Sequence, residues 1–392
     1  MEEKSLGSTW VEIDLDNIKH NFEGIKEKVS DNVKMCMVLK ADAYGHGSVE
    51  LGKFYEELGA DFFAVARTSE GFQLRNNGIR LPILNLGVTD PDDYREAIRE
   101  NISMTIFSYE TAYFLDKIAK EENLSAKIHI KLDTGMSRLG FVVKDDNLDS
   151  IISEIKKISQ LENVIMEGMF THFATADIKN KEFKDLQMFR FNSIVRELEN
   201  LNIRPQIVHC SNSAEILESI ERYDMVRPGI VQYGVYPSDE VDHTVDVKPV
   251  MSFKTKVTNI KNLEPGVSIG YGRTYFTTVD ERIATIAVGY ADGFLRGRRH
   301  PHVYINGNKC PVVGRICMDQ TMVRIPMDKD IKIGDEVLIF GDQYISVVQV
   351  AKECETIEHE VLCAVDKRVK RAYKLNNEIV KIVDYLNGEK NA

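Results

Sequence analysis

The sequence lacks several patterns that identify particular classes of protein. It has no C-x-x-C pair and no HExxH, Walker A or GxGxxG motif. No basic stripe or arm is present, and 61 acidic against 50 basic residues give a net charge of −11, which argues against nucleic-acid binding. We predict no metal site, and we expect reduced, mostly buried thiols at the six scattered cysteines Cys36, Cys210, Cys310, Cys317, Cys354 and Cys363.

Long apolar runs are also missing. No uninterrupted stretch approaches the ~20 residues of a membrane-spanning helix. The N-terminal MEEKSLGSTW lacks the apolar core of a signal peptide. We therefore expect a cytoplasmic protein with no membrane partner. Its 392 residues, 43% of them hydrophobic, are enough for a large core divided between two or three domains.

What the sequence does contain, between about residues 34 and 233, is an alternation of short apolar runs with amphipathic stretches. Such an alternation indicates parallel βαβ units, and one amphipathic stretch, 184–201, predicts a helix with Phe189, Ile194, Val195 and Leu198 on its apolar side. Eight runs favour a closed (β/α)8 barrel over an open doubly wound sheet. The runs are KMCMVL, DFFAVA, PILNLG, ISMTIF, KIHIKL, VIMEGMF, QIVHCS and GIVQYG.

After about Val247 the pattern becomes one of strands joined by turns, such as Asn306-Gly307, and it indicates a mainly antiparallel β domain. The predicted fold is therefore α/β, with a TIM-type barrel in residues 10–242, a β domain in 243–380 and a tail in 381–392. We expect the first strand, 9–15, to pair with the β domain. A last amphipathic helix is expected within residues 376–392.

The ten residues VLKADAYGHG (38–47) carry the strongest functional signal. An apolar strand ends there in a single lysine, Lys40, and a turn follows. A lysine at the end of a buried strand can lose hydration, so that its pKa falls and its amine becomes a nucleophile for aldehydes. Pyridoxal phosphate (PLP) is the expected aldehyde cofactor. A solvent-exposed lysine and an aldolase-type Schiff base without PLP are the alternatives.

Other polar residues also follow the predicted barrel strands, where barrel enzymes place their chemistry. Because phosphate is often bound after strands seven and eight, Ser213, Gly229 and Ile230 are candidate phosphate ligands, joined by Tyr44. An arginine cannot accept a proton, so Arg227 facing the pyridine nitrogen would leave that nitrogen unprotonated. The remaining polar residues at strand ends are Lys131, Asp133, Arg138, His172 and His209.

Eight separated motifs between residue 10 and about residue 373 resemble those of alanine racemase, a fold-type III PLP-dependent family. The resemblance implies a homodimer of barrel-plus-β-domain subunits with shared active sites. It implies interconversion of L- and D-alanine, which supplies D-alanine for the cell wall. The motifs are VLKADAYGHG, KLDTGMSRLG, THFATAD, NSA (212–214), MVRPGI, IGYGRTYF, GYADGF and VGRICMDQ.

The resemblance also implies the catalytic residues. Lys40 would carry the internal aldimine and act as one base, and Tyr271 of the other subunit would be the second base. Arg138, together with Met318 and Asp319 of the other subunit, would hold the substrate carboxylate.

The same resemblance assigns further positions around the cofactor. Lys131 matches a lysine that is often carbamylated, and His172 and Arg227 would form a hydrogen-bonded chain behind the second base. Phosphate would be bound by Tyr44, Ser213, Gly229 and Ile230. The channel that gives access to the site would be lined by Asp177, Tyr290, Arg296 and Arg315.

One residue departs from the family pattern. His359, in TIEHEVLC, stands where many members have a tyrosine near the phosphate and the inner gate. An imidazole can still form a hydrogen bond there, but a reshaped gate would admit serine or a broader range of amino acids. A decarboxylase of the same fold type is a further alternative, although such enzymes place an acidic residue at the pyridine nitrogen.

Overall fold

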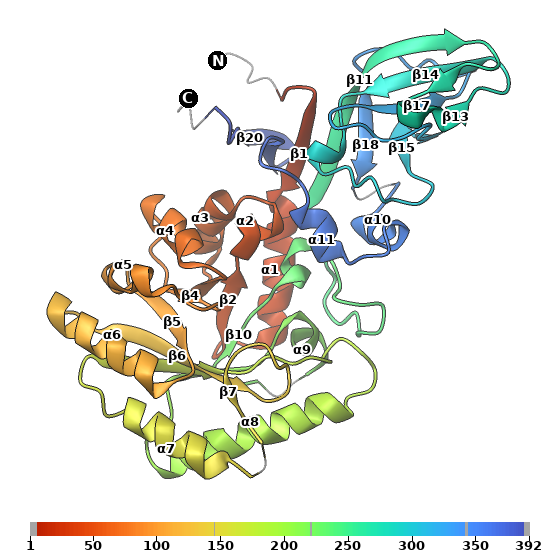
Figure 1. Cartoon of the computed structure of the whole chain (residues 1–392). Helices are drawn as coiled ribbons and strands as arrows, with labels where there is room; N and C mark the ends of the chain where they lie inside the picture. Colours follow the sequence, from red (N-terminus) through yellow and green to blue (C-terminus); the bar gives the residue numbers. More distant parts are fainter. Residues whose placement is uncertain (1–5, 145, 220–221, 342–343, 388–392) are drawn as a thin grey trace.

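The computed structural model describes residues 6–144, 146–219, 222–341 and 344–387, and Figure 1 shows a barrel with a second domain projecting from it. The barrel sheet has the strand order β10-β2-β3-β4-β5-β6-β8-β9, all parallel, with the short β7 (Phe141–Val142) beside β6. Its eight main strands are β2 (Lys34–Val38), β3 (Phe62–Val65), β4 (Ile83–Asn85), β5 (Ile102–Ile106), β6 (Ala126–Asp133), β8 (Val164–Phe170), β9 (Ile207–His209) and β10 (Met225–Val226).

The last strand returns to the first, and the barrel nearly closes. Backbone hydrogen bonds of 3.0 Å join Asp224 N to Val208 O and Arg227 N to Ser211 O, which connects the β10 region to the β9 region. The predicted α/β barrel is confirmed. The prediction that GIVQYG is its eighth strand is wrong. Strand β10 ends at Val226 because Pro228 has no N–H to donate, and Ile230–Tyr233 form a 3-10 helix, η2.

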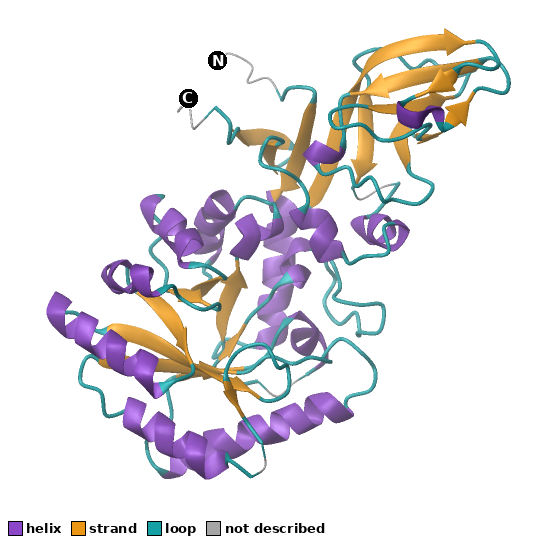
Figure 2. Ribbon diagram, viewed as in Figure 1, coloured by secondary structure: helices purple, strands orange, loops and turns teal. Residues whose placement is uncertain are grey.

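Helices cover the outside of the barrel (Figure 2). In α1 (Leu15–Val29), the Asp14 side chain accepts a hydrogen bond from Asn17 N, and Ile18, Phe22 and Ile25 face the core. The others are α3 (Ser48–Leu58), α4 (Thr68–Asn76), the 3-10 turn η1 (Pro91–Asp93), α5 (Tyr94–Arg99), α6 (Tyr109–Glu122), α7 (Leu148–Ile158), α8 (Glu182–Asn200) and α9 (Ser213–Glu218).

The predicted helix at 184–201 corresponds to α8, but one of its apolar residues was assigned to the wrong side. Phe189 is 63% exposed, whereas Phe191, Ile194, Val195 and Leu198 are buried. Phe191 and Ile194 are three residues apart, and so share one helix face, from which Phe189 points away.

The second domain is built on a mixed sheet with the order β16-β15-β18-β11-β1-β19-β20, in which β14 pairs with β11 and β17. Strand β1 (Thr9–Asp14) lies between β11, to which it is antiparallel, and β19, to which it is parallel. The other bounds are β11 (Met251–Leu263), β14 (Glu281–Ile286), β15 (His302–Ile305), β16 (Asn308–Pro311), β17 (Thr321–Ile325), β18 (Glu336–Phe340), β19 (Lys370–Leu375) and β20 (Glu378–Val383).

Short elements complete this domain. Asn306 and Gly307, with φ of 48° and 75°, make the two-residue turn between β15 and β16, as the sequence predicts. The remaining elements are the hairpin β12 (Ser268–Ile269) and β13 (Tyr275–Phe276), the 3-10 turns η3 (Tyr271–Arg273) and η4 (Tyr290–Asp292), and the helices α10 (Val347–Glu353) and α11 (Glu358–Cys363).

The expected helix near the C-terminus is instead a strand. Asn376 and Asn377 both have positive φ, 52° and 64°, and they reverse the chain after β19, so that β20 pairs antiparallel with it. The β-branched residues of EIVKIV favour this pairing. Residues 388–392 of the expected tail lie outside the described residues. Among the described helices, none is long and apolar enough to cross a membrane.

The backbone at Gly234, just after η2, lies very close to the backbone at Lys248, and this contact allows the packing to be tested. Gly234 has a φ of +79°, and a Cβ added there would lie 1.8 Å from the Lys248 carbonyl oxygen. We expect Gly234→Ala to lower the free energy of unfolding by at least about 3 kcal/mol, because the backbone must move. The measurement is denaturant-induced unfolding.

The matched control is Gly78→Ala. Gly78 has a φ of +86°, but no atom of the described residues lies within 4 Å of the added Cβ. Only left-handed strain of about 1 kcal/mol is expected there. Equal losses in the two variants would contradict the packing argument.

Candidate active site

Lys40 begins a turn with an uncommon backbone. Strand β2 ends at Val38, and α2 (Lys40–Tyr44) follows it at the carboxyl end of the barrel strands. Ala41, Asp42, Ala43 and Tyr44 all have φ between 52° and 54°, so they form a left-handed helical turn. Such a turn costs about 1–2 kcal/mol per residue and persists only where its surroundings hold it. It places Lys40 at one end and Tyr44 at the other.

The surroundings of Lys40 favour a neutral amine. Burial lowers the pKa of Lys40 most, and the nearby Arg138 cation lowers it further, with a small contribution from Arg227; Cys363 and Glu70 oppose the shift without reversing it. A deprotonated lysine amine is a nucleophile toward a carbonyl carbon. The structure therefore supports the nucleophilic lysine that the sequence predicts.

Tyr44, Ser213 and Gly229 meet in one small cradle. Ser213 Oγ accepts hydrogen bonds from Gly229 N at 2.9 Å and Val231 N at 3.4 Å, which leaves its own hydroxyl hydrogen free to donate. A Cβ added at Gly229 would lie 3.2 Å from Tyr44 Oη and 3.3 Å from Ser213 Oγ. Burial raises the pKa of Tyr44, which therefore remains a donor. Ile230, the next residue, is buried at the start of η2.

His359 lies at the edge of this cradle. Its ring centroid is 5.5 Å from that of Tyr44, and its buried Nδ1 has no hydrogen-bond partner among the described residues. Burial lowers the pKa of His359, Lys40 lowers it further and Asp177 raises it, so both of these predicted site residues lie near the imidazole. A cradle of hydroxyl groups and an unpartnered imidazole fits an oxyanion such as a phosphate ester.

Arg227 is held at the barrel centre by three acceptor atoms. Its guanidinium donates to His209 Nδ1 at 2.6 Å, to Thr171 O at 2.9 Å and to Cys210 O at 3.0 Å. Burial lowers the pKa of Arg227 to about 10, so it remains a cation at neutral pH. Because an arginine cannot accept, His209 Nδ1 must be unprotonated and its Nε2 must carry the hydrogen.

From His209, a chain of hydrogen bonds continues across the barrel to a carboxylate. His209 Nε2 lies 2.9 Å from His129 Nδ1, and His129 Nε2 lies 3.1 Å from Glu167 Oε2. The Ser103 hydroxyl also donates to Glu167. Burial opposes ionisation of Glu167, but the hydrogen bonds from His129 and Ser103 lower its pKa overall. A single donor direction therefore runs from Arg227 to Glu167.

Lys131, Asp133 and Arg138 lie on β6 and the loop after it. Asp133 Oδ1 accepts from Gly135 N and Ser137 N at 3.0 Å and 2.9 Å, which orders the loop that carries Arg138. Lys131 Nζ donates to Leu132 O at 2.7 Å. Burial lowers the pKa of Lys131 to about 7, and Arg227 contributes to this shift. This loop borders an open cavity of about 880 Å³ lined by Arg138, Asp133 and Ser137, among others.

The other predicted site residues belong to the β domain. Tyr271 lies in η3, beside β13, and Figure 1 shows β13 in the part of the domain that projects away from α2. Tyr271 is 71% exposed and Met318 is 52% exposed. A Cβ added at Gly272 would lie 3.3 Å from Arg315 Nη1, so Arg315 is packed against η3.

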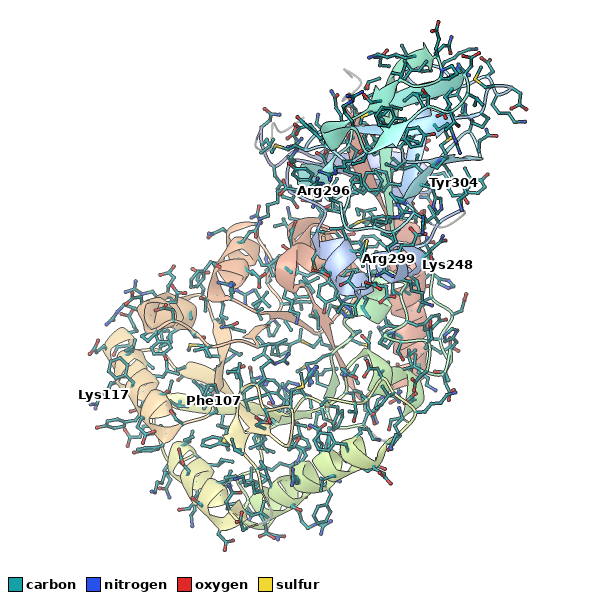
Figure 3. The ribbon with its side chains drawn as sticks, turned by 45° about the vertical axis from the view of Figure 1, so that its right-hand side comes forward. Phe107, Lys117, Lys248, Arg296, Arg299 and Tyr304 are labelled. Carbon is teal, nitrogen blue, oxygen red and sulfur yellow. The ribbon has the colours of Figure 1, made fainter. Side chains whose placement is uncertain are left out.

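Tyr271 and Arg315 thus lie together, and Tyr290, Met318 and Asp319 lie near one another in a second group. Met318 O accepts from Ala291 N at 3.0 Å, next to Tyr290, and Asp319 pairs with Arg368 at 2.7 Å. Arg296 is exposed where the β domain meets the barrel (Figure 3). Within one chain, the structure thus gathers Lys40, Tyr44, Lys131, Arg138, His172, Asp177, Ser213, Arg227, Gly229, Ile230 and His359 around the barrel mouth. It leaves Tyr271, Tyr290, Arg296, Arg315, Met318 and Asp319 on the β domain.

Two functional candidates were missed by the sequence reasoning. His129 and Glu167 lie in the apolar runs KIHIKL and VIMEGMF, where His129 is buried on β6 and Glu167 is half-buried on β8. A polar side chain in the interior needs a partner. That signal was available, but the sequence does not say which partner each residue finds.

Four histidines are buried in a form that resists protonation. Burial lowers the pKa of His46 to about 4, and it lowers the pKa of His129, His172 and His209, with the Arg227 cation contributing to the last three. Unfolded histidine titrates near pH 6.5. Below that pH the unfolded chain binds more protons than the folded chain, so folded stability is lost as the pH falls toward the lowered values.

We therefore expect the free energy of unfolding to fall between pH 6.5 and pH 5.5, by about 1 kcal/mol for His46, whose pKa is lowered to about 4, and further in the same direction for the other three histidines. Denaturant unfolding across this range measures it. His46→Gln destabilises at every pH, but it should make the pH dependence less steep by about one proton. The control is His300→Asn, which removes an exposed imidazole. An unchanged slope in His46→Gln would contradict the assignment.

The comparisons with known proteins agree with this architecture. The family model for the N-terminal domain of alanine racemase matches residues 13–237, and that for the C-terminal domain matches residues 250–373. An alanine racemase of Clostridium novyi is 44% identical over 392 residues, covering 98% of this chain and all of the relative.

Solved structures give the same result. The alanine racemase of Clostridium difficile 630 superposes with a TM-score of 0.94 at 47% identity, covering 97% of this chain and 99% of that one. That of Bacillus anthracis, determined with bound L-Ala-P, has a TM-score of 0.91 at 36% identity, covering 97% and 98%. Neither the serine nor the decarboxylase alternative is favoured by these relatives. Both domains match one family over nearly their whole length, and the chain belongs to the alanine racemase family.

Proposed function

We propose that this protein interconverts L- and D-alanine with pyridoxal phosphate. The observation that carries the proposal is the half-buried Lys40 amine, which lies at the start of a strained turn beside a cradle of phosphate-binding groups in a chain of this family. When bound, PLP withdraws electrons from the substrate and stabilises the charge left by loss of the α-proton. The residues present fit such a group, because the cradle holds free donors and the unpartnered His359 Nδ1.

Each barrel-mouth residue has a role in holding the cofactor. Tyr44, Ser213, Gly229 and Ile230 bind the phosphate, and Lys40 binds the aldehyde carbon. Arg227 donates to the pyridine nitrogen. Since Arg227 keeps its own proton and is fixed by His209, it would leave that nitrogen unprotonated and the electron withdrawal would be moderate. Moderate withdrawal favours rapid return of a proton to the α-carbon over other reactions.

A second copy of the chain completes the site in this proposal. Tyr271, Met318 and Asp319 lie on exposed turns of the β domain, away from α2 of their own chain. On the barrel, the cavity beside Arg138 is open to solvent. We propose a homodimer in which the β domain of each subunit covers the barrel mouth of the other. Asp177, Tyr290, Arg296 and Arg315 then line the access channel.

Two bases on opposite faces exchange the proton. Lys40 takes or returns the α-proton on one face, and the partner subunit's Tyr271 does so on the other, with His172 and Arg227 behind the phenol. Arg138 holds the substrate carboxylate, joined by the partner subunit's Met318 and Asp319. We propose that the product serves as D-alanine for the cell wall and that the protein works in the cytoplasm.

The direct test is a racemisation assay across a panel of L-amino acids with PLP added. We expect alanine to be the best substrate. The purified protein should show the absorbance band of a lysine-bound PLP, which borohydride removes and Lys40→Ala lacks. A Lys40→Ala protein that keeps the band would refute the assignment of this lysine.

Tyr271→Phe tests the two-base scheme. Because a phenylalanine ring has no hydroxyl to carry a proton, exchange of the α-proton with solvent deuterium should be lost from one alanine enantiomer far more than from the other. Proton NMR of each enantiomer in deuterium oxide measures it. Equal and mild losses from both enantiomers would count against the scheme.

Lys131 is proposed as a carbamylated residue. With its pKa at about 7, a large fraction of the amine is neutral at physiological pH, and only the neutral amine attacks carbon dioxide. The N–C bond forms, a proton leaves and the amine becomes an anionic carbamate among the cations of Arg138 and Arg227. Carbon-13 NMR with labelled bicarbonate should show a carbamate signal.

That signal should weaken as the pH drops below about 7 and should be absent from Lys131→Ala. A signal that persists in Lys131→Ala would come from another amine and would contradict the proposal.

A further inference from the structure

The chain's last strands return to the turn that follows Lys40. We call β19, β20 and the residues up to Tyr385 the C-terminal hairpin (residues 370–385). It belongs to the sheet of the β domain, where β19 lies beside β1, yet side chains of the hairpin contact residues 42–50 of the barrel. This contact is made within one chain, by residues that take no part in the site described above.

Arg371 makes the most buried of these contacts. Only 1% of its surface is exposed, and its Nε donates to Gly45 O at 3.1 Å. The other guanidinium nitrogens donate to the backbone carbonyls of Val365, Asp366 and Val369. No carboxylate of the described residues pairs with it. Gly45 closes the left-handed turn, so this arginine connects the turn's end to the segment that leads into β19.

Tyr373 holds the next residue. Its hydroxyl donates to His46 O at 2.9 Å, and the ring is fully buried. Gly47 follows with a φ of +96°, and a Cβ added there would lie 1.8 Å from Tyr373 Oη. The hairpin and the turn are therefore packed so closely that position 47 has no room for a side chain.

Tyr385 and Lys381 complete the set from the far end of the hairpin. The Tyr385 hydroxyl donates to Asp42 Oδ2 at 2.9 Å, and the other oxygen of that carboxylate accepts from Ser48 N at 2.8 Å. Lys381 Nζ pairs with Glu50 at 2.8 Å. Asp42 is itself one of the four left-handed residues.

A left-handed turn of four ordinary residues does not persist unless it is held from outside. Here the hairpin holds it at Asp42, Gly45 and His46, between Lys40 and the start of α3. We propose that the C-terminal hairpin is a positioning device for the cofactor site of its own subunit, and that Arg371, Tyr373 and Tyr385 are positioning residues for Lys40 and Tyr44. The inference rests on the proposed function, because it takes Lys40 and Tyr44 as the groups that bind PLP.

The experiment compares Tyr385→Phe and the double variant Tyr373→Phe/Tyr385→Phe with the wild-type chain. Each change removes a hydroxyl and keeps the ring. The control is Tyr304→Phe, on β15 of the same sheet and outside the hairpin. Two readouts are taken: the dissociation constant of PLP from an absorbance titration, and amide hydrogen exchange of peptides covering residues 40–48 without PLP.

We expect the PLP dissociation constant to rise roughly five-fold in Tyr385→Phe, as for the loss of one hydrogen bond, and further in the double variant. Amide exchange at residues 40–48 should become faster in both, while peptides from α6 and the control variant stay unchanged. A role limited to overall stability would speed exchange throughout the chain.

Unchanged exchange at 40–48 in the double variant would overturn the proposal, and so would PLP affinity equal to that of the wild type. The two proposals fail separately. If the wild-type chain does not bind PLP, the proposed function is refuted. If the wild type binds PLP and the hairpin variants bind it equally well, only the positioning role is refuted.

Discussion

The left-handed turn after Lys40 is the constraint on which the rest of this structure depends. Four residues at about 1–2 kcal/mol each make it a cost of roughly 4–8 kcal/mol, comparable with the whole stability of many domains. The barrel meets part of this cost, since Leu39 N donates to Ala64 O at 2.8 Å and Ala41 N to Glu70 at 2.6 Å. The β domain meets another part through Arg371 and Tyr373. A reactive lysine is thus fixed by both domains.

Charge is distributed unevenly around that lysine. The cations Arg138 and Arg227 lie at the barrel mouth beside Lys40 and Lys131, whose pKa values burial lowers. Burial and the Arg227 cation also lower the pKa values of His172 and His209, so these histidines are neutral. The carboxylate linked to Arg227, Glu167, is two imidazoles away. The two arginines therefore give the mouth cationic groups that suit the anionic groups of a phosphorylated cofactor and an amino acid.

The sequence allowed the barrel to be predicted because its strands are short, apolar and regularly spaced. The predictions of individual elements were wrong where one or two residues override the pattern. Pro228 ends the eighth strand before GIVQYG, and Asn376-Asn377 turns an apparently helical segment into β20. Lys40 and the phosphate residues followed from strand ends. Tyr271 and Met318 followed only from family resemblance, because an exposed turn carries no sign of the second chain it would reach.

The role of the hairpin could not be predicted from the sequence, because its most buried contacts with the barrel involve backbone atoms. Arg371 and Tyr373 alternate on a strand that reads as ordinary sheet, and their partners are backbone carbonyls, which leave no mark in a sequence. In the sequence, Gly47 is a sign of the contact between hairpin and turn, since only a residue without a side chain fits against Tyr373. In the proposed dimer, each β domain then acts on two sites: its hairpin holds the lysine turn of its own barrel, while its exposed turns complete the site of the other. Loosening the hairpin would weaken a site directly, whereas loosening the exposed turns would affect only the partner's site.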